Sequence, residues 1–115
     1  MPRTLLLVLI YGLALPASAE AADRTGADVY AAACAACHAS GAMGAPKFGN
    51  ASAWKKRIAT GLNSLVRSAL TGKGAMPAKA GHEDLSDMEV ARAVVHMANA
   101  GGGRFKESTV SGALK

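Results

Sequence analysis

Residues 34–38 read Cys-Ala-Ala-Cys-His, and this stretch decides how the rest of the sequence is interpreted. Cys34 and Cys37 are the only cysteines in the 115 residues, and His38 follows them directly. A disulfide between residues three apart would close too small a loop to restrain the unfolded chain much. We therefore expect the two thiols to bind a ligand or to carry out chemistry, and not to staple the fold.

The first 19 residues have the pattern of a secretory signal peptide. Arg3 gives a positive start, residues 5–15 are almost wholly apolar, and residues 17–19 (Ala-Ser-Ala) have the form of a cleavage site. The alternative is a retained membrane anchor, but the apolar run is shorter than the roughly 20 residues that span a bilayer, and Pro16 interrupts it. We expect residues 1–19 to be removed on export to the periplasm.

The composition indicates a basic protein with few large side chains for its core. Without Arg3, 12 Lys and Arg remain against 8 Asp and Glu, so the mature chain carries a net charge of +4, which favours acidic partners. Half of the residues are apolar, yet aromatic residues make up only 4%. Large rings usually fill and rigidify a small core. We therefore expect a bound group to fill part of it.

The spacing of apolar residues predicts four helices and no strand, which is an all-α fold. The first helix begins at Gly26 and runs into the motif, because alanine dominates it and Gly26, Tyr30 and Cys34 recur on one face. Glycines and Pro46 make residues 39–50 a loop.

Three further helices are expected after this loop. Ser52 and Asn63 are expected to cap two short helices, each of which ends before a glycine. Ser86 and Glu89 form a capping box at the start of the last helix, which ends near Asn99.

The folded domain is expected to span residues 20–100. Within it, residues 72–81 hold three glycines and a proline and predict an irregular loop around Met76. The glycines at 101–103 are expected to end ordered structure, so that residues 101–115 form a flexible Gly-rich tail. The alternative is a docked terminal helix.

Three kinds of site begin with a Cys-x-x-Cys pair: a disulfide relay, a zinc site and a covalent haem attachment site. On a helix, Cys34 and Cys37 can present sulfur to one edge of a flat ligand, while His38 reaches toward its centre. Zinc needs four ligands, and only His82 and His96 remain, without finger spacing. A relay needs strands around the pair, and none is predicted. The pattern favours one haem c per chain, attached through both thiols, with His38 on the iron.

The residue on the other face of the iron decides between electron transfer and ligand binding. Met76 lies in a glycine-rich loop and precedes Pro77, which cannot continue a helix. We therefore expect Met76 to be the second axial ligand, and its thioether to raise the reduction potential relative to two imidazoles. The other candidates are Met43, Met88, Met97, His82 and His96. Either histidine as the second ligand would give bis-histidine ligation.

Several segments in the right order carry a family resemblance. Gly26, Tyr30, the Cys-x-x-Cys-His motif and residues 74–77 (Gly-Ala-Met-Pro) are accompanied by residues 44–47 (Gly-Ala-Pro-Lys) and by Trp54. With these segments the chain resembles the class I monohaem bacterial cytochromes c, and most closely the short c-five type. The resemblance covers about residues 24 to 98.

The resemblance implies a class I cytochrome c fold, with about four short helices around one covalent haem. It implies that the first and last helices cross at right angles, with Gly26 permitting close approach and Tyr30 packing at the contact. It further implies that the Pro46 carbonyl accepts a hydrogen bond from the free ring nitrogen of His38, and that Trp54 packs near the haem propionates.

The chain departs from the family pattern in three places. The c-five type often carries a second cysteine pair before the last helix, and this chain has none. The last helix of the family usually presents an aromatic residue where this chain has His96. The glycine-rich tail also lies outside the pattern. We therefore expect a softer helix crossing than in the family.

We expect a periplasmic one-electron carrier and not an enzyme. Two alternatives remain open: the haem subunit of a larger dehydrogenase, and a ligand-binding or catalytic haem protein in which Met76 is displaced. We expect a monomer that docks on acidic redox partners, makes transient contact with membrane complexes and binds no nucleic acid. The expected docking side carries Lys55, Lys56, Arg57, Arg67, Lys73 and Lys79, and the opposite charges are Glu83, Asp84, Asp87 and Glu89.

Overall fold

The computed structural model describes residues 10–12 and 23–114. The expected signal peptide, residues 1–19, lies outside the described residues except for 10–12, which form no helix or strand. No helix within the described part of the chain is both long and apolar enough to cross a membrane.

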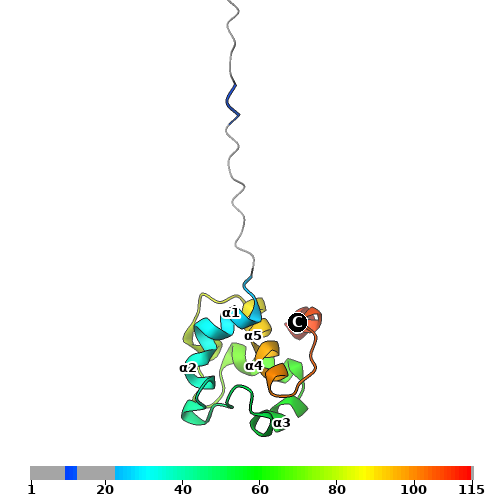
Figure 1. Cartoon of the computed structure of the whole chain (residues 1–115). Helices are drawn as coiled ribbons and strands as arrows, with labels where there is room; N and C mark the ends of the chain where they lie inside the picture. The colour runs from blue at the N-terminus through cyan, green and yellow to red at the C-terminus, as the bar shows by residue number, and fades with distance from the viewer. Residues whose placement is uncertain (1–9, 13–22, 115) are drawn as a thin grey trace, which may run out of the picture.

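Residues 26–113 form an all-α domain, as predicted, and the part of the chain that the structure describes contains no named strand (Figure 1). A single isolated β-bridge joins Lys73 and Met76. The α-helices are α1 (Gly26–Val29), α2 (Ala35–His38), α3 (Ala51–Ala59), α4 (Leu62–Thr71), α5 (Asp87–Ala100) and α6 (Val110–Ala113). The other turns of helix are η1 (Tyr30–Cys34), η2 (Ala42–Gly44), η3 (Ala78–Gly81) and η4 (Glu107–Thr109).

The first helix is continuous from Gly26 to His38 but is not a regular α-helix. Its η1 segment is a turn of π-helix, in which the Ala35 amide donates to the Tyr30 carbonyl five residues back. Such turns are rare and concentrate at functional sites. This π-helical turn ends at Cys34, the first residue of the motif. The wider turn shifts the helical register of α2 relative to that of α1. The sequence predicted an ordinary helix here, because alanine suits both forms.

Two of the three predicted helix caps are wrong. The capping box of α5 is confirmed: Glu89 N donates to Ser86 Oγ at 3.0 Å and Ser86 N donates to Glu89 Oε1 at 3.1 Å. Helix α3 is capped by Asn50, whose Oδ1 accepts from Ala53 N, and not by Ser52. Helix α4 starts after a glycine, and not at a side-chain cap. Where two residues that can cap a helix lie close together, the conformation of the preceding loop determines which of them is the N-cap.

Helices α1 and α5 touch through their backbones, as the resemblance implied. Gly26 is buried, and a Cβ there would lie 2.3 Å from the Arg92 carbonyl oxygen. Next to this contact, Tyr30 packs against Phe48 and His96, with ring centroids 4.5 and 5.5 Å apart. Phe48 and His96 are 5.3 Å apart. Phe48 therefore supplies ring contacts in a place where the last helix offers only an imidazole.

Polar contacts tie the segment before α1 to the start of α5. Arg24 Nε donates to Glu89 Oε2 at 2.6 Å, and Ser86 Oγ donates to Asp23 Oδ1 at the same distance. Arg92 Nη1 donates to the Asp23 carbonyl at 3.1 Å. The hydrogen bond from Arg24, followed by that from Ser86 N, lowers the pKa of Glu89 to about 2. Glu89 is therefore ionised in the folded protein at neutral pH.

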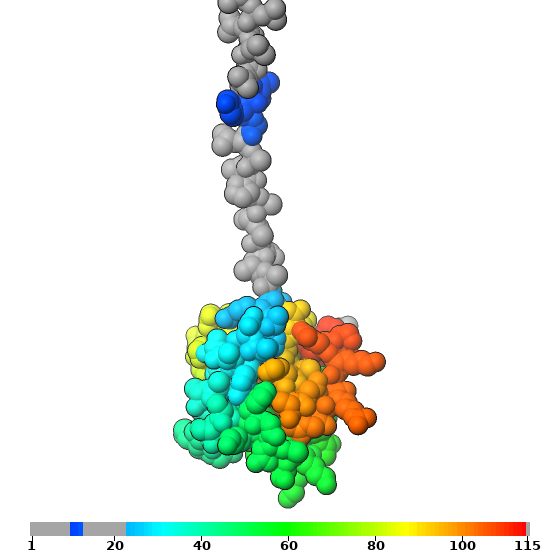
Figure 2. All heavy atoms as spheres, in the orientation of Figure 1, coloured from blue at the N-terminus to red at the C-terminus, as the bar shows by residue number. Residues whose placement is uncertain are grey.

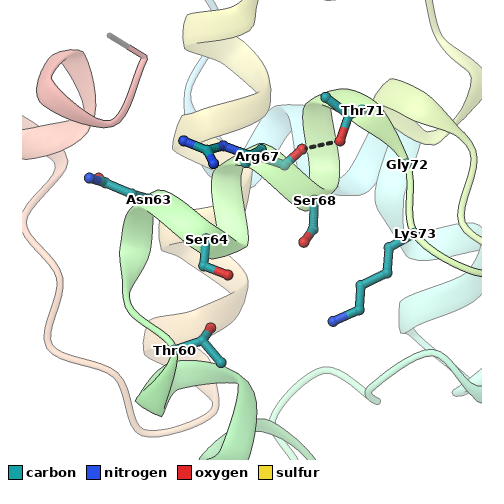
Figure 3. A pocket seen from close by; sticks show the side chains of 8 residues that line it. All are labelled: Thr60, Asn63, Ser64, Arg67, Ser68, Thr71, Gly72 and Lys73. Carbon is teal, nitrogen blue, oxygen red and sulfur yellow. Dashed lines mark hydrogen bonds between the residues drawn. The ribbon is translucent and has the colours of Figure 1, made fainter.

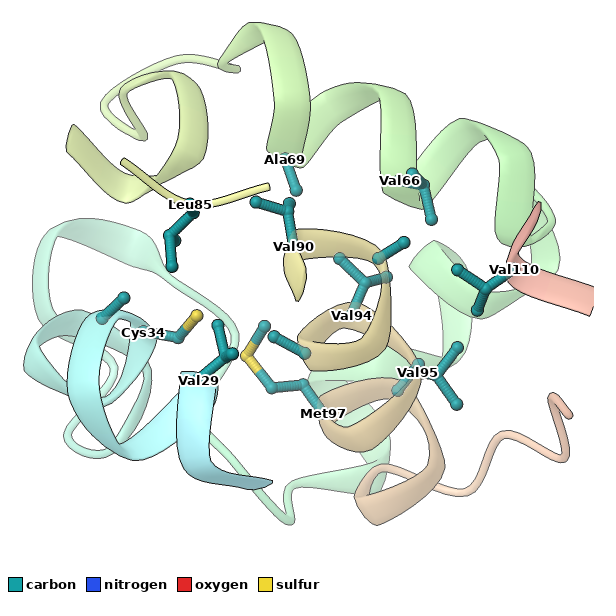
Figure 4. Packing of buried hydrophobic residues seen from close by; sticks show 14 of the residues in the cluster. Val29, Cys34, Val66, Ala69, Leu85, Val90, Val94, Val95, Met97 and Val110 are labelled. Atoms are coloured by element: carbon teal, nitrogen blue, oxygen red, sulfur yellow. The ribbon is translucent and has the colours of Figure 1, made fainter. Parts of the chain in front are cut away.

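The expected flexible tail is wrong for residues 101–114, which pack on the domain (Figure 2). Val110 in α6 is fully buried, and Figure 4 shows it beside Val95 of α5. Asn99 exchanges two hydrogen bonds of 2.9 Å with the backbone of Phe105. The structure shows the alternative, a docked terminal helix. The glycines sit in a tight turn that brings an apolar segment back onto the domain, so they end α5 without ending the ordered structure.

Small side chains dominate the core. The largest fully buried side chains are Val29, Val66 and Val110, and Trp54 is the one aromatic residue among the buried hydrophobic residues that the structure describes. The sulfurs of Cys34 and Met97 lie within this cluster (Figure 4). A core of this kind has little rigid apolar surface of its own, in line with the low aromatic content of the sequence.

Candidate functional site

The motif lies at the end of the first helix, with its two thiols in different environments. Cys34 is buried and Cys37 is exposed, and no disulfide joins them. Burial raises the pKa of the Cys34 thiol to about 11, so this thiol is protonated at neutral pH. The attacking thiol of a disulfide relay has a lowered pKa, and the Cys34 thiol does not. Cys34 is therefore not suited to be the attacking thiol of a relay.

The His38 ring is buried and is held by one backbone acceptor. Its Nδ1 lies 2.8 Å from the Pro46 carbonyl oxygen. A carbonyl only accepts, so Nδ1 carries the proton and the lone pair is on Nε2, the nitrogen that a metal would use. Phe48 N donates to the His38 carbonyl at 2.7 Å and closes the loop from the other side. The ring is thus oriented as a metal-bound histidine usually is.

Trp54 belongs to the same neighbourhood. Its Nε1 donates to the Lys47 carbonyl at 3.1 Å, and its ring centroid lies 6.0 Å from that of His38. Gly101 lies against its other side, where a Cβ would come within 2.5 Å of Trp54 Cγ. The loop after the motif, α3 and the end of α5 therefore meet at this indole.

Met76 stands in a tight turn away from these contacts. Its amide and carbonyl pair with those of Lys73, at 2.9 and 3.0 Å, and Gly74 between them has a φ of 57°. The side chain is half-buried and packs against the buried cluster that includes Cys34 and Trp54. The described contacts of the His38 side chain join it to Pro46 and Trp54, and none of them joins it to Met76.

The other candidate ligands are less well placed. Met43 is 78% exposed and Met97 is buried in the core, while His82 is exposed and His96 packs with Tyr30. Among the residues with a described placement, no group of three or more His, Cys, Asp or Glu side chains is close enough to hold a metal ion. These residues therefore offer no ready donor set for zinc.

The residues present fit a covalently attached haem. Two reduced thiols lie a helical turn apart, and the adjacent histidine has one nitrogen fixed and the other available. The thiol that faces the core adjoins a cluster of alanine and valine with few rings. A flat, largely apolar group with an iron that prefers nitrogen and sulfur donors suits this combination.

The chain matches the family model described as Cytochrome C oxidase, cbb3-type, subunit III over residues 21–97. The chain belongs to this family of c-type cytochromes. A small c-type cytochrome of this family is an electron carrier, and it carries a covalently attached haem c. The two cysteines of this cytochrome are consistent with the Cys-x-x-Cys-His motif.

Named relatives agree with the family. This cytochrome is 45% identical over 94 residues to cytochrome c-555 of Chlorobaculum tepidum, a match that covers 78% of this chain and 83% of the relative. It is 41% identical over 83 residues to cytochrome c5 of Ectopseudomonas mendocina, covering 70% and 95%. These matches confirm the resemblance to monohaem class I cytochromes c close to the c5 type.

A solved structure confirms the fold class. The neighbour is a chain from the electron transfer complex of nitrite reductase with cytochrome c, with a TM-score of 0.63 and 39% sequence identity. The match covers 66% of this cytochrome and 93% of that chain. The family match ends at residue 97, so the packed C-terminal segment lies beyond it.

The expected basic docking side is not one uniform surface. Arg67 and Lys73 line a groove of about 420 Å³, and Figure 3 shows Lys73 and Ser68 directed into it. Lys79, by contrast, is 3.0 Å from the Asp87 carboxylate and is engaged within the domain. The groove is lined by Thr60, Asn63, Ser64, Arg67, Ser68, Thr71, Gly72 and Lys73.

Some residues around the site were missed at the level of sequence. Phe48 lies in a loop without periodicity, and nothing in its neighbours marks it as a ring partner of Tyr30. Gly101 was interpreted as a helix breaker, although its contact with Trp54 requires the absence of a side chain. A usable signal existed for the C-terminal segment: Val110 and Leu114 are four residues apart, which is the spacing of one helical face.

Proposed function

We propose that this cytochrome is a periplasmic one-electron carrier in which His38 and Met76 are the two axial ligands of the haem iron. The single observation that carries the proposal is the hydrogen bond between His38 Nδ1 and the Pro46 carbonyl, 2.8 Å long. It leaves Nε2 as the donor for iron and keeps the ring from turning. The raised pKa of the buried Cys34 thiol disfavours this residue as the attacking thiol of a disulfide relay.

The protein side chains divide the work of holding the cofactor. Cys34 and Cys37 would anchor it through thioether bonds, one at the core and one at the surface. Met76, on its two-residue turn, would present its sulfur from the opposite side. When bound, the haem supplies an iron that takes up and gives away one electron. Trp54 would pack near the propionates, as the family resemblance implies.

Filling both axial positions makes the site suited to electron transfer and not to substrate chemistry. A thioether is a weak donor that favours ferrous iron, so it raises the reduction potential relative to a second imidazole. With no open position, the protein would have little to reorganise when the electron arrives or leaves. We therefore propose that the chain is not an enzyme.

Absorption of the ferric protein tests the axial assignment. Sulfur ligation gives ferric haem a weak band at the red end of the spectrum, and Met76→Ala should abolish it, lower the potential and let the ferrous protein bind carbon monoxide. Met43→Ala is the matched control, because Met43 is also a loop methionine but is 78% exposed. A band that survives Met76→Ala contradicts the assignment.

The partner is proposed to be an acidic redox protein. Five cations of α3, α4 and the Met76 turn remain for docking, since Lys79 is paired within the domain. Long-range attraction of this kind speeds encounter and weakens as salt is added. Electron-transfer rates with an acidic partner should therefore fall with ionic strength, and the charge-removing variant Arg67→Gln should reduce the salt dependence. The five are Lys55, Lys56, Arg57, Arg67 and Lys73.

A second candidate is a haem subunit of a larger redox complex. The description of the matching family names an oxidase subunit, and this is the observation that supports the second candidate. Size-exclusion chromatography of the native protein from its own cells separates the two: a monomer supports the carrier, and a stoichiometric complex supports the subunit. Fractionation of the same cells and the mass of the mature N-terminus test export and cleavage after residue 19.

A further inference from the structure

The turn that follows Met76 has a backbone conformation that L-residues disfavour. Lys79 and Ala80 have φ angles of 52° and 55°, in the left-handed region. A Cβ makes this conformation costly, so two consecutive non-glycine residues there need support from their surroundings. Backbone hydrogen bonds at the two sides of the turn run from Ala80 N to the Pro77 carbonyl at 3.1 Å and from His82 N to the Lys79 carbonyl at 2.9 Å.

The Lys79 side chain provides further support. Its Nζ donates to the Leu85 carbonyl at 2.9 Å and lies 3.0 Å from Asp87 Oδ1. Leu85 is buried, and Asp87 is the first residue of α5, so the ammonium ties the turn both to the core and to the last helix. Because the Lys79 side chain is only 26% exposed, these charge-assisted contacts are partly shielded from water.

The turn and Met76 belong to one packed loop. A Cβ at Gly72 would lie 3.1 Å from both the Met76 carbonyl oxygen and the Ala78 amide nitrogen, so the start of the loop packs against residues 76–78. Met76 is also paired with Lys73 through both of its backbone groups. A displacement of the turn at Lys79 is therefore transmitted to Met76.

We propose that Lys79 is a positioning residue for Met76, which latches the loop of residues 72–81 onto Leu85 and Asp87. This inference rests on the proposed function, in which Met76 is an axial ligand. The latch offsets the cost of the left-handed backbone and keeps the loop closed. Removing the latch raises the population of an open loop, in which Met76 is away from the iron and a competing ligand has access.

Imidazole binding to the ferric holoprotein measures that population. Imidazole competes with Met76, so its apparent affinity rises with the fraction of open loop. Lys79→Ala should tighten imidazole binding about tenfold, the effect of losing one hydrogen bond from a charged group. Lys79→Arg keeps a donor and should restore most of the wild-type value.

Lys73→Ala is the matched control. It removes the same charge from the same loop, and the exposed Lys73 side chain takes part in none of the salt bridges formed by the described residues. Its imidazole binding should equal that of the wild type. Hydrogen exchange of the Ala80 and His82 amides provides a second readout, and it should quicken in Lys79→Ala and not in Lys73→Ala.

Two further variants probe the parts of the latch. Ala80→Gly removes the Cβ from a left-handed position and should weaken imidazole binding, an effect of opposite sign. Asp87→Asn removes the ion pair and leaves the Leu85 carbonyl as acceptor, so it should tighten imidazole binding by less than Lys79→Ala. Asp87 is exposed, so this variant keeps the test decisive if Lys79→Ala does not fold.

The outcomes separate the latch from the proposed function. Equal imidazole binding in Lys79→Ala and Lys73→Ala overturns the latch, as does wild-type binding in both Ala80→Gly and Asp87→Asn. A wild-type ferric protein without the band of sulfur ligation overturns the axial role of Met76 itself. A band that is present in the wild type, with imidazole binding that changes in the stated directions, supports both.

Discussion

The His38 side of the site is fixed by a backbone acceptor within residues 34–48, whereas the Met76 side depends on the charged side chain of Lys79. His38 is oriented by Pro46, eight residues away, and its carbonyl is closed off by Phe48. The loop of residues 72–81 is held instead by Lys79, which contacts the Leu85 carbonyl and the Asp87 carboxylate. Both sides are held by residues within eight positions along the chain, but the first is fixed by a backbone acceptor next to the motif and the second by a side-chain ion pair and hydrogen bond.

This difference teaches which perturbations should reach which ligand. Changes near Trp54 should act on the His38 side first, and changes at the start of α5 should act on the Met76 side first. Changes at the α1 and α5 contact should reach both sides, because that contact carries the motif helix and the last helix together. The predictions below test this division in order of falling effect.

Trp54→Ala should have the largest effect. Removing the one large ring of the buried cluster leaves a cavity beside His38 and should lower the free energy of unfolding by about 4 kcal/mol. Denaturant unfolding of the holoprotein measures this. The Nε1 hydrogen bond to Lys47 is lost at the same time, so Trp54→Phe, which keeps a ring, should cost clearly less. Equal losses in the two variants would contradict a packing role.

Gly26→Ala should have the next largest effect and should loosen both sides. The added Cβ would lie 2.3 Å from a backbone oxygen of Arg92, so the helices must move apart at a cost of about 3 kcal/mol. Thermal unfolding measures the loss, and the ferric sulfur band reports whether Met76 is affected too. Gly112→Ala is the control, since nothing lies within 4 Å of a Cβ there. A silent Gly26→Ala would show that the crossing tolerates separation.

Val110→Ala should cost about 2 kcal/mol, the effect of removing two buried methyl groups. This variant tests whether the C-terminal segment is part of the fold or a detachable tail. The neighbouring Ser111 is exposed, so Ser111→Ala should leave the denaturant midpoint unchanged. A Val110→Ala protein as stable as the wild type would support the flexible tail that the structure contradicts.

Acid should weaken the start of α5 with a small but defined pH dependence. The hydrogen bonds from Arg24 and Ser86 lower the pKa of Glu89 from 4.5 to about 2, so its ionised form favours the folded state. The contribution to stability is complete above the unfolded value of 4.5 and is lost as the pH falls toward about 2.

Glu89→Gln tests this dependence. Denaturant unfolding at a series of pH values should show the variant less stable than the wild type at neutral pH, with the difference vanishing in acid. Exposed Glu83, which takes part in none of the described salt bridges, provides the control Glu83→Gln. A constant difference between wild type and Glu89→Gln across this range would assign the effect to packing and not to charge.

Local patterns in the sequence predicted a large share of the fold and of the site. The all-α class, the helix that carries the motif and the α5 capping box follow from short-range rules, and the structure has them. The hydrogen bond between His38 and Pro46 was implied by family resemblance and is present. Cys34 and Cys37 as attachment points and Met76 as ligand remain predictions, and the ferric spectrum tests the last of them.

Other features could not be predicted because they depend on which segments meet. From the sequence, Lys79 was one of the expected docking cations. In the structure its side chain contacts Leu85 and Asp87 instead. From the sequence, Gly101 was expected only to end the last helix. In the structure it also packs against the Trp54 ring, which leaves no room for a side chain. The π-helical turn before Cys34 is a further case, since alanine accepts either helix.

By itself, the sequence determined that this chain is a helical protein organised around a Cys-x-x-Cys-His motif, because the spacing of thiols, imidazole, glycines and apolar residues acts over only a few positions. Only the tertiary structure decided where the C-terminal segment lies and which lysine is tied to the core. The physical reason is that the burial of Val110 depends on helices distant along the chain, and that the partners of Lys79, although near in sequence, come within reach only in the folded turn.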